Sequence, residues 1–306
     1  MSVKVEQLTK IYGTQRAVDT IDFEIKTGEI LGFLGPNGAG KTTTMKMITA
    51  YLPPTEGKIF VDGIDVVEDS LVAQSLIGYL PEHNPLYKEM YVKEYLTFVA
   101  HLYKINQPKK RIEELIEMTG LGREQHKLIG ALSKGYRQRV GLAQAMIHDP
   151  KVLILDEPTS GLDPNQLAEI RSLIKQMGEK KTVIFSTHIM QEVQALCDRV
   201  IIINQGRLVA DDPIERLQSR MAGEHLITLG FSKKIGKEKL ERIDGITKVE
   251  TLGNNRWRLT STTKKDVREA IFRLAVELDT PLLEMHKDEL SVEDVFRQLT
   301  LSKSKR

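Results

Sequence analysis

The eight residues from Gly35 to Thr42 are the first point in the sequence where residue types and spacing indicate chemistry. They read Gly-Pro-Asn-Gly-Ala-Gly-Lys-Thr and fit G-x-x-x-x-G-K-[ST], a pattern that cradles phosphates when it connects a strand to a helix. Glycines let backbone N–H groups at a helix N-terminus turn toward phosphate oxygens. Lys41 adds a positive charge at the β- and γ-phosphates, and Thr42 offers a hydroxyl to Mg²⁺. We therefore expect a nucleotide to bind at Gly35, Pro36, Asn37, Gly38, Ala39, Gly40, Lys41, Thr42 and Thr43.

The acidic pair Asp156-Glu157 is a second group that can do chemistry, and it follows the apolar run 152–155. A strand that ends in two acids places both at the carboxyl edge of a parallel sheet, near the predicted phosphate loop. There Asp156 can hold Mg²⁺ through water, and Glu157 can accept a proton from the water that attacks the γ-phosphate. The sequence thus predicts hydrolysis of the bound nucleotide.

The elements that must position these residues are near-continuous apolar runs separated by helical lengths. Residues 30–34 read as a buried strand, and no helix breaker occurs between Gly40 and Pro53, so a strand, a glycine-rich turn and a helix are expected in that order. Such runs suit a parallel sheet covered on both faces, which makes the fold class α/β. Further strands are predicted at 151–155, 182–186 and 200–203.

A helical insert is expected within this α/β core, from about residue 82 to 150, because apolar residues recur there at helical spacing. After a helical link that follows Pro213, the pattern changes to βαββαβ, the ferredoxin-like order. The predicted domains are therefore 1–219, which binds nucleotide, and 220–306, a ferredoxin-like accessory domain. The core expected for the second domain is Leu226, Leu229, Val249, Leu259, Ile271, Leu274 and Leu283.

Composition narrows the function classes. The 306 residues suit about two domains, and 44 Lys plus Arg against 42 Asp plus Glu leave a net charge of +2, so no nucleic-acid partner is expected. No apolar run approaches the ~20 residues of a membrane-spanning helix, and the first residues lack the apolar stretch of a secretory signal. The single cysteine, Cys197, cannot form an internal disulfide. We expect a cytoplasmic protein.

Further motifs make the chain resemble, over essentially its whole length, the nucleotide-binding subunit of an ATP-binding cassette (ABC) transporter. Tyr12 matches the aromatic residue that stacks on adenine in that family, and His188 matches the switch histidine. Residues 132–136, Leu-Ser-Lys-Gly-Tyr, fall at the family signature, and 160–163, Ser-Gly-Leu-Asp, match the D-loop that contains Asp163. The resemblance implies a P-loop NTPase (RecA-like) cassette with a helical subdomain, an ATPase whose cofactors are ATP and Mg²⁺.

The resemblance also implies roles for individual residues. Glu157 and His188 would be catalytic, and Mg²⁺ would be held by Thr42, Glu82 and Asp156.

It further implies partners. Two chains would close head to tail over two ATP molecules, so that Ser133, Lys134 and Gly135 contact the ATP of the partner chain. The pair is a homodimer or includes a related subunit. A multi-spanning membrane permease would hold the cassettes at the inner face of the cell membrane.

Two positions depart from the family pattern. The signature has Lys134 and Tyr136 where the commonest form has Gly and Gln. Because Ser133 and Gly135 remain, closure over ATP is expected to survive. Glu82 stands where the family usually places a Gln that reaches the metal. Its negative charge should favour Mg²⁺ and make the empty site more repulsive toward phosphate.

Within the family, a single cassette followed by a ferredoxin-like tail is similar to the ABC-2 type exporters. Residues 77–87 and 132–142 most resemble the gliding-motility-associated subunit of that group. Two alternatives remain open. One is a soluble ABC ATPase that acts on a non-membrane partner, and the other is a nucleotide-gated module with little hydrolysis.

Overall fold

The computed structural model describes residues 1–216, 224–262 and 266–288 and divides into two compact units. The units are Met1–Asp212 and Pro213–Arg306, so the division lies a few residues before the boundary expected at 219. In the described part of the chain, no helix combines the length and the apolar character needed to cross a membrane.

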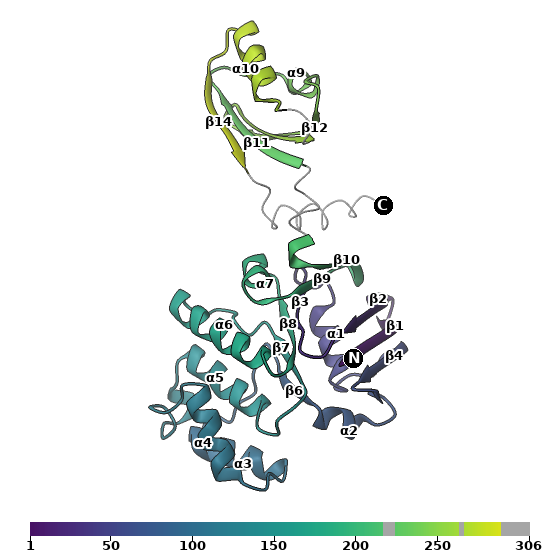
Figure 1. The fold of residues 1–306 in the computed structure, drawn as a ribbon, viewed down its shortest axis with the longest axis vertical. Coiled ribbons are helices and arrows are strands. Elements are labelled where there is room, and N and C mark those ends of the chain that lie inside the picture. The colour runs from purple at the N-terminus through teal and green to yellow at the C-terminus, as the bar shows by residue number, and fades with distance from the viewer. Residues whose placement is uncertain (217–223, 263–265, 289–306) are drawn as a thin grey trace. The chain divides into compact units, whose positions relative to one another are not determined.

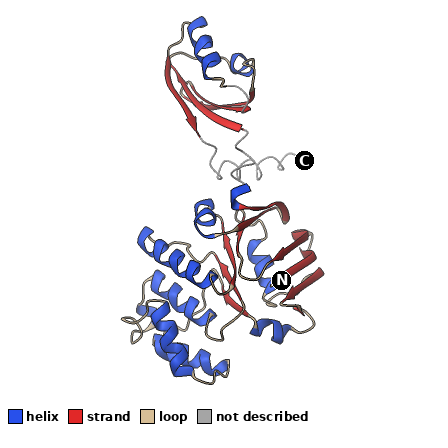
Figure 2. Ribbon diagram, viewed as in Figure 1, coloured by secondary structure: helices blue, strands red, loops and turns tan. Residues whose placement is uncertain are grey.

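Strands and helices alternate through most of the first unit (Figures 1 and 2). Its strands are β1 (Val3–Tyr12), β2 (Gln15–Ile25), β3 (Ile30–Leu34), β4 (Glu56–Val61), β5 (Ile64–Asp65), β6 (Ile77–Leu80), β7 (Val152–Asp156), β8 (Thr182–Thr187), β9 (Arg199–Asn204) and β10 (Arg207–Pro213). Its helices are α1 (Lys41–Ile48), α2 (Ser70–Ser75), α3 (Val92–Leu102), α4 (Pro108–Met118), the 3₁₀ helix η1 (Ile129–Ala131), α5 (Lys134–Ala145), α6 (Pro164–Gly178) and α7 (Met190–Leu196).

A six-stranded sheet in the order β10-β9-β3-β8-β7-β6 carries the site. The pairs β9-β3, β3-β8, β8-β7 and β7-β6 are parallel, as the apolar runs predict. In their register Leu34 pairs with Thr187 and Asp156 with Ser186. The carboxyl ends of β3, β7 and β8 therefore meet at one edge, where the phosphate loop, the acidic pair and His188 follow directly.

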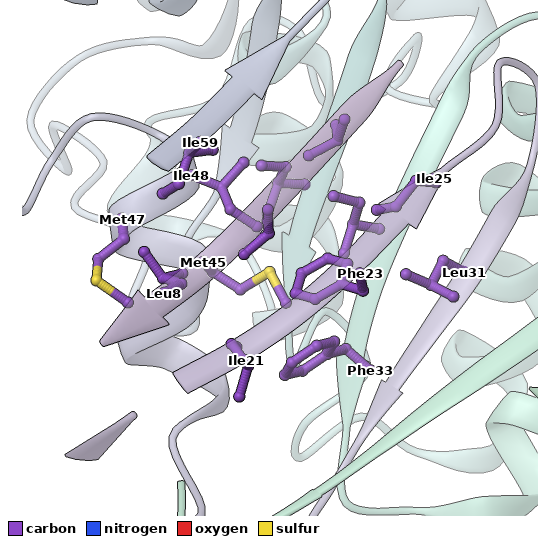
Figure 3. Packing of buried hydrophobic residues seen from close by; sticks show 14 of the residues in the cluster. Leu8, Ile21, Phe23, Ile25, Leu31, Phe33, Met45, Met47, Ile48 and Ile59 are labelled. Atoms are coloured by element: carbon purple, nitrogen blue, oxygen red, sulfur yellow. The ribbon is translucent and has the colours of Figure 1, made fainter. Parts of the chain in front are cut away.

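A second, antiparallel sheet in the order β2-β1-β4-β5 was not predicted from the sequence. Helix α1 contacts β2 and β4 of this sheet and also β7 of the other, so it lies between the two sheets. The core between them is apolar (Figure 3). Its fully buried members include Leu8, Ile21, Ile25, Leu31, Phe33, Met45, Met47, Ile48 and Ile59.

The helical insert consists of α3, α4 and α5, which lie together beside the six-stranded sheet (Figure 1). Tyr95 on α3 donates a hydrogen bond from its hydroxyl to Gln144 on α5, at 2.7 Å. Arg111 on α4 donates to the carbonyl oxygens of Met146 and Ile147 that follow α5. These bonds tie α3 and α4 to α5, the helix that begins at the signature, and to the residues that follow it.

The second unit has the element order β11 (Glu224–Phe231), α9 (Lys237–Glu241), β12 (Ile246–Gly253), β13 (Arg256–Thr262), α10 (Arg268–Glu277) and β14 (Leu282–Asp288). Its sheet has the order β12-β13-β11-β14 with antiparallel neighbours. The unit has its own apolar core, in which Leu229, Val249, Leu259 and Ile271 are buried and Leu274 is partly buried.

The expectation that Leu283 is buried in this core is wrong, because its side chain is 72% exposed. The register of β14 shifts at this point: Gly230 pairs with Glu284, and the next residue, Phe231, pairs with Leu282. Leu282 packs against the core in its place. The side chain of Leu226 lies outside the described residues.

Candidate functional site

The phosphate loop connects β3 to α1 in a conformation that requires glycine. Gly38 and Gly40 have φ values of 78° and 111°, in the left-handed region. A side chain at Gly35 would place its Cβ 2.4 Å from the carbonyl oxygen of Ile203. Gly40 is also the N-cap of α1 and provides no side chain to cap it. The first N–H groups of this helix are thus free of a side-chain cap and can bind an anion.

Lys41 is buried at the start of α1, with only 6% of its side chain exposed. Its ammonium donates to the carbonyl oxygens of Gly35 at 2.8 Å and Pro36 at 3.3 Å. It also lies 3.4 Å from Oε1 of Glu157. A buried charge needs such partners. Because a phosphate oxygen could join them, the ammonium is placed for a nucleotide that enters the loop.

Glu157 follows β7 with φ 49°, a conformation that is rare for a residue with a side chain. Its N–H donates to both the carbonyl oxygen and Oγ of Ser186, each at 3.1 Å. The Ser186 hydroxyl in turn donates to Oδ1 of Asp156. Ser186 therefore fixes both acids of the predicted pair, and the surrounding structure holds the strained backbone.

The carboxylate of Glu157 lies between two basic groups. Oε1 faces Lys41, and Oε2 is 2.9 Å from Nδ1 of His188. Burial raises the pKa of Glu157, and the opposing effects of Lys41 and His188 do not cancel the rise. A carboxylate with a raised pKa accepts a proton more readily than an exposed one, which suits a general base.

Lys41, Glu157 and His188 line a cleft of about 520 Å³ together with Glu82 and Tyr12. Glu82 is exposed, and Tyr12 is 48% exposed with the Lys10 ammonium 5.6 Å from its ring centroid. Four other residues predicted to bind nucleotide or Mg²⁺ do not line the cleft: Gly35, Pro36, Ala39 and Asp156. The full lining is Tyr12, Gln15, Ala17, Asn37, Gly38, Gly40, Lys41, Thr42, Thr43, Glu82, Glu157, Ser160 and His188.

Gln15 and Ala17 line the cleft but were not predicted as site residues. They belong to β2, which follows Tyr12 after a tight turn and brings them beside the phosphate loop. The only signal was their nearness to Tyr12 in the sequence.

The oxygen atoms near the loop suit Mg²⁺. Asp156 is fully buried, and its Oδ2 has no hydrogen-bond partner. Thr42 and Glu82 line the cleft nearby. Within residues 1–216, 224–262 and 266–288, no group of three or more His, Cys, Asp or Glu could hold a metal ion alone. Mg²⁺ bound here would therefore take further ligands from phosphate and water.

The signature residues lie at the start of α5 and are not part of the cleft lining of their own chain. Ser133 is the N-cap, and its Oγ accepts from the N–H of Tyr136 at 3.3 Å. A Cβ on Gly135 would lie 2.7 Å from the side chain of Gln166, at the start of α6. Lys134 is exposed, and its ammonium lies against Gly161.

Asp163 of the predicted D-loop caps α6 and accepts from the N–H groups of Asn165 and Gln166, both at 3.0 Å. The preceding Ser160 lines the cleft. The segment from Glu157 to Asp163 thus connects the acidic pair to the surface where the signature begins.

Comparison with known proteins identifies similar proteins. Residues 18–160 match the family model described as ABC transporter. The bacitracin transport ATP-binding protein BcrA of Bacillus licheniformis is 40% identical over 220 residues, which cover 71% of this chain and 72% of that protein.

Two solved structures are similar to this chain over about 70% of its length. The ATP-binding cassette MJ0796, dimeric in a post-hydrolysis state with ADP and Pi, is 27% identical with a TM-score of 0.64 and covers 69% of this chain and 98% of its own. The protein cbiO1 of Clostridium perfringens, part of the ABC transporter complex cbiONQ, is 30% identical with a TM-score of 0.64 and covers 72% of this chain and 93% of its own.

Proposed function

The chain belongs to the family of ABC transporter ATP-binding proteins, and from this premise we propose that it is the ATP-hydrolysing subunit of an ABC-2 type exporter. Binding of ATP and ATPase activity are properties of the family. The observation that carries the proposal is the convergence of Lys41 and His188 on the carboxylate of Glu157, beside the phosphate loop.

In the proposed hydrolysis, the phosphate loop and Lys41 hold the β- and γ-phosphates. Glu157 orients the attacking water and accepts its proton at a carboxylate oxygen, while His188 fixes that carboxylate through Nδ1. Thr42, Asp156 and Glu82 would hold Mg²⁺, which supplies positive charge to the phosphates. The buried, unpartnered Oδ2 of Asp156 supports this assignment.

The proposed active form is a pair of cassettes, from two copies of this chain or from one copy and a related subunit. Ser133, Lys134 and Gly135 lie at the N-terminus of α5 and do not line the cleft of their own chain. Ser133 and Lys134 are exposed, and Gly135 is buried. That placement supports contact with the ATP of a partner chain. The dimeric cassette among the similar structures supports the same arrangement.

The proposed membrane partner is a multi-spanning permease that holds the cassettes at the cytoplasmic face of the membrane. The helical insert would dock it, because Glu82 lies at the cleft and the chain runs from there into the insert. Tyr87 offers an exposed aromatic contact, since its ring is 55% exposed and packs on Tyr95 and Phe98 with centroid distances of 5.8 Å. Membership of the cbiONQ complex by a similar cassette supports such a partner.

Two narrower assignments complete the proposal. The second unit is a ferredoxin-like accessory domain, which its βαββαβ order and antiparallel sheet support. The second assignment is a gliding-motility role, which is supported only by the resemblance of residues 77–87 and 132–142. The relative BcrA is named for bacitracin transport instead.

The proposal is tested in proteoliposomes that contain the permease purified with this chain. ATP hydrolysis by the chain should rise when the permease is present and should require Mg²⁺. A permease that binds the chain without changing its ATPase rate would argue against the exporter assignment and leave the ATPase assignment intact.

A further inference from the structure

Thr187 connects three parts of the site. It is the last residue of β8 and directly precedes His188. Its carbonyl oxygen accepts from the N–H of Gly35 in the phosphate loop, at 3.4 Å. Its hydroxyl accepts from the N–H of Ile189 at 3.0 Å and donates to Oε2 of Glu192 at 2.6 Å. The hydroxyl therefore closes a short turn around His188, and the backbone of the same residue contacts the phosphate loop.

Glu192 is a buried acid that has no place in the proposed hydrolysis. It lies in α7, its exposed fraction is 0%, and it does not line the cleft. Oε2 accepts from Thr187, and Oε1 lies 4.0 Å from Nη2 of Arg171 on α6. Burial of a carboxylate is costly even with such partners. The cost of burying the Glu192 carboxylate indicates that this side chain has a role other than packing.

We propose that Glu192 is a positioning residue that acts through Thr187 to hold His188 against Glu157. The Glu192 carboxylate orients the Thr187 hydroxyl, so that the hydroxyl's lone pair faces the N–H of Ile189. This fixes the backbone on both sides of His188. The inference rests on the proposed roles of Glu157 and His188, and it adds the device that aligns them.

The need for such a device follows from the exposure of His188. Its side chain is 44% exposed, and its Nδ1 forms a hydrogen bond with Oε2 of Glu157 at 2.9 Å. An exposed ring on an unconstrained turn would sample several orientations, and small errors of position reduce catalytic rates strongly. The anchor lies on the buried side of the turn, where water does not compete with the bond between Thr187 and Glu192.

The test is Thr187→Val, which keeps the shape of the side chain and removes the hydroxyl. We expect kcat for ATP hydrolysis to fall about tenfold or more, with KM for ATP changed less than about threefold. Thr187→Ser restores the hydroxyl and should recover most of kcat. Glu192→Met should match Thr187→Val. Glu192→Gln keeps an oxygen that can accept from Thr187, so its loss should be smaller.

Thr182→Val is the matched control. Thr182 lies in the same strand, is 1% exposed, and its Oγ1 accepts from the N–H of Gly28 at 3.0 Å. The control thus removes a buried hydroxyl and its hydrogen bond at the opposite end of β8. It should lower thermal stability as Thr187→Val does while kcat stays within about twofold of wild type. Equal losses of kcat in the two variants would overturn the proposal.

A double-mutant cycle with His188→Ala separates positioning from general structural support. If Thr187 acts through His188, Thr187→Val should reduce kcat no further once the imidazole is absent. A full additional loss in that background would contradict the proposal. If His188→Ala or Glu157→Gln itself hydrolyses ATP at the wild-type rate, the proposed catalytic roles fail instead, and the two failures are distinguishable.

Discussion

Nδ1 of His188 lies 2.9 Å from Oε2 of Glu157, across the carboxyl edge of the six-stranded sheet. The two residues follow different strands, β8 and β7, which are parallel neighbours in the register that pairs Asp156 with Ser186. The contact therefore depends on sheet register. A shift of one residue in either strand would separate the pair.

Loss of the Lys41 ammonium should weaken ATP binding. In Lys41→Ala the phosphates lose a buried positive charge, so we expect the Kd for ATP to rise at least about tenfold, or ~1.4 kcal/mol. Equilibrium binding of a fluorescent ATP analogue measures the change. Lys46→Ala is the control, because Lys46 lies in the last turn of the same helix and does not line the cleft. Equal affinities of the two variants would refute the role of Lys41.

The pH dependence of hydrolysis should reflect the raised pKa of Glu157. The carboxylate must be ionised to accept a proton, so the rate falls as the pH is lowered through this pKa. Because burial raises it, the acidic limb of kcat/KM should lie above the ~4.3 of an ordinary Glu side chain. Circular dichroism at each pH shows whether the protein remains folded. An acidic limb at or below the ordinary value in folded protein would be inconsistent with Glu157 as the base.

Glu82 should weaken ATP binding when Mg²⁺ is absent, because its charge repels phosphate in the cleft. Glu82→Gln removes this repulsion, and we expect ATP to bind about fivefold more tightly in EDTA, or ~1 kcal/mol. With Mg²⁺ the gain should shrink or reverse, since the variant loses an anionic ligand. Glu89→Gln, at an exposed acid outside the cleft, is the control. A gain that is the same with and without Mg²⁺ would exclude a metal-linked role.

Tyr87 should matter for the permease and not for hydrolysis itself. Tyr87→Asp places a charge on the exposed aromatic surface, so stimulation of the ATPase by the permease should be lost while the basal rate stays within about twofold. Tyr51→Asp, at a 74% exposed tyrosine outside the insert, should leave stimulation unchanged. Loss of the basal rate together with stimulation in Tyr87→Asp would indicate misfolding and count against a docking role.

The second unit is expected to strengthen pairing of the cassettes. The first unit contains the whole cleft and its own core, so a chain that ends at Gln218 should still bind ATP. Its dimerisation in ATP should be weaker than that of the full chain, which sedimentation velocity measures. A truncated chain that is folded and matches the full protein in dimerisation, ATPase and transport would leave the second unit without a regulatory role.

Residues in contiguous motifs could be identified from the sequence because each motif directly follows an apolar strand. Lys41, Asp156, Glu157 and His188 belong to this class, and the parallel sheet brings them to one edge. Glu192 and the hydroxyl of Thr187 could not be identified in this way, because they belong to no such motif. Their types and spacing are ordinary, and their connection depends on how α7 packs under the turn, which no local pattern encodes.

The strands also differ in how well the sequence predicts them. The parallel strands were predicted because burial on both faces produces continuous apolar runs. The antiparallel sheet that begins with β1 was not, because its register shifts after Val5, Leu8 and Lys10 interrupt the alternation of buried and exposed residues. Leu283 was misplaced for a related reason, since the register shift in β14 puts Leu282 into the core instead.

The central claim is that Glu157 is the general base for ATP hydrolysis. The most direct test measures the steady-state Mg²⁺-dependent ATPase rate of wild type and of Glu157→Gln, and the mass of each protein in the presence of ATP. Glutamine keeps the size of Glu157 and cannot accept the proton from water. Glu157→Gln should lose at least about a hundredfold in rate and accumulate as an ATP-bound dimer. Hydrolysis by Glu157→Gln at the wild-type rate would show that this carboxylate is not the base, and that the cleft does not work as described.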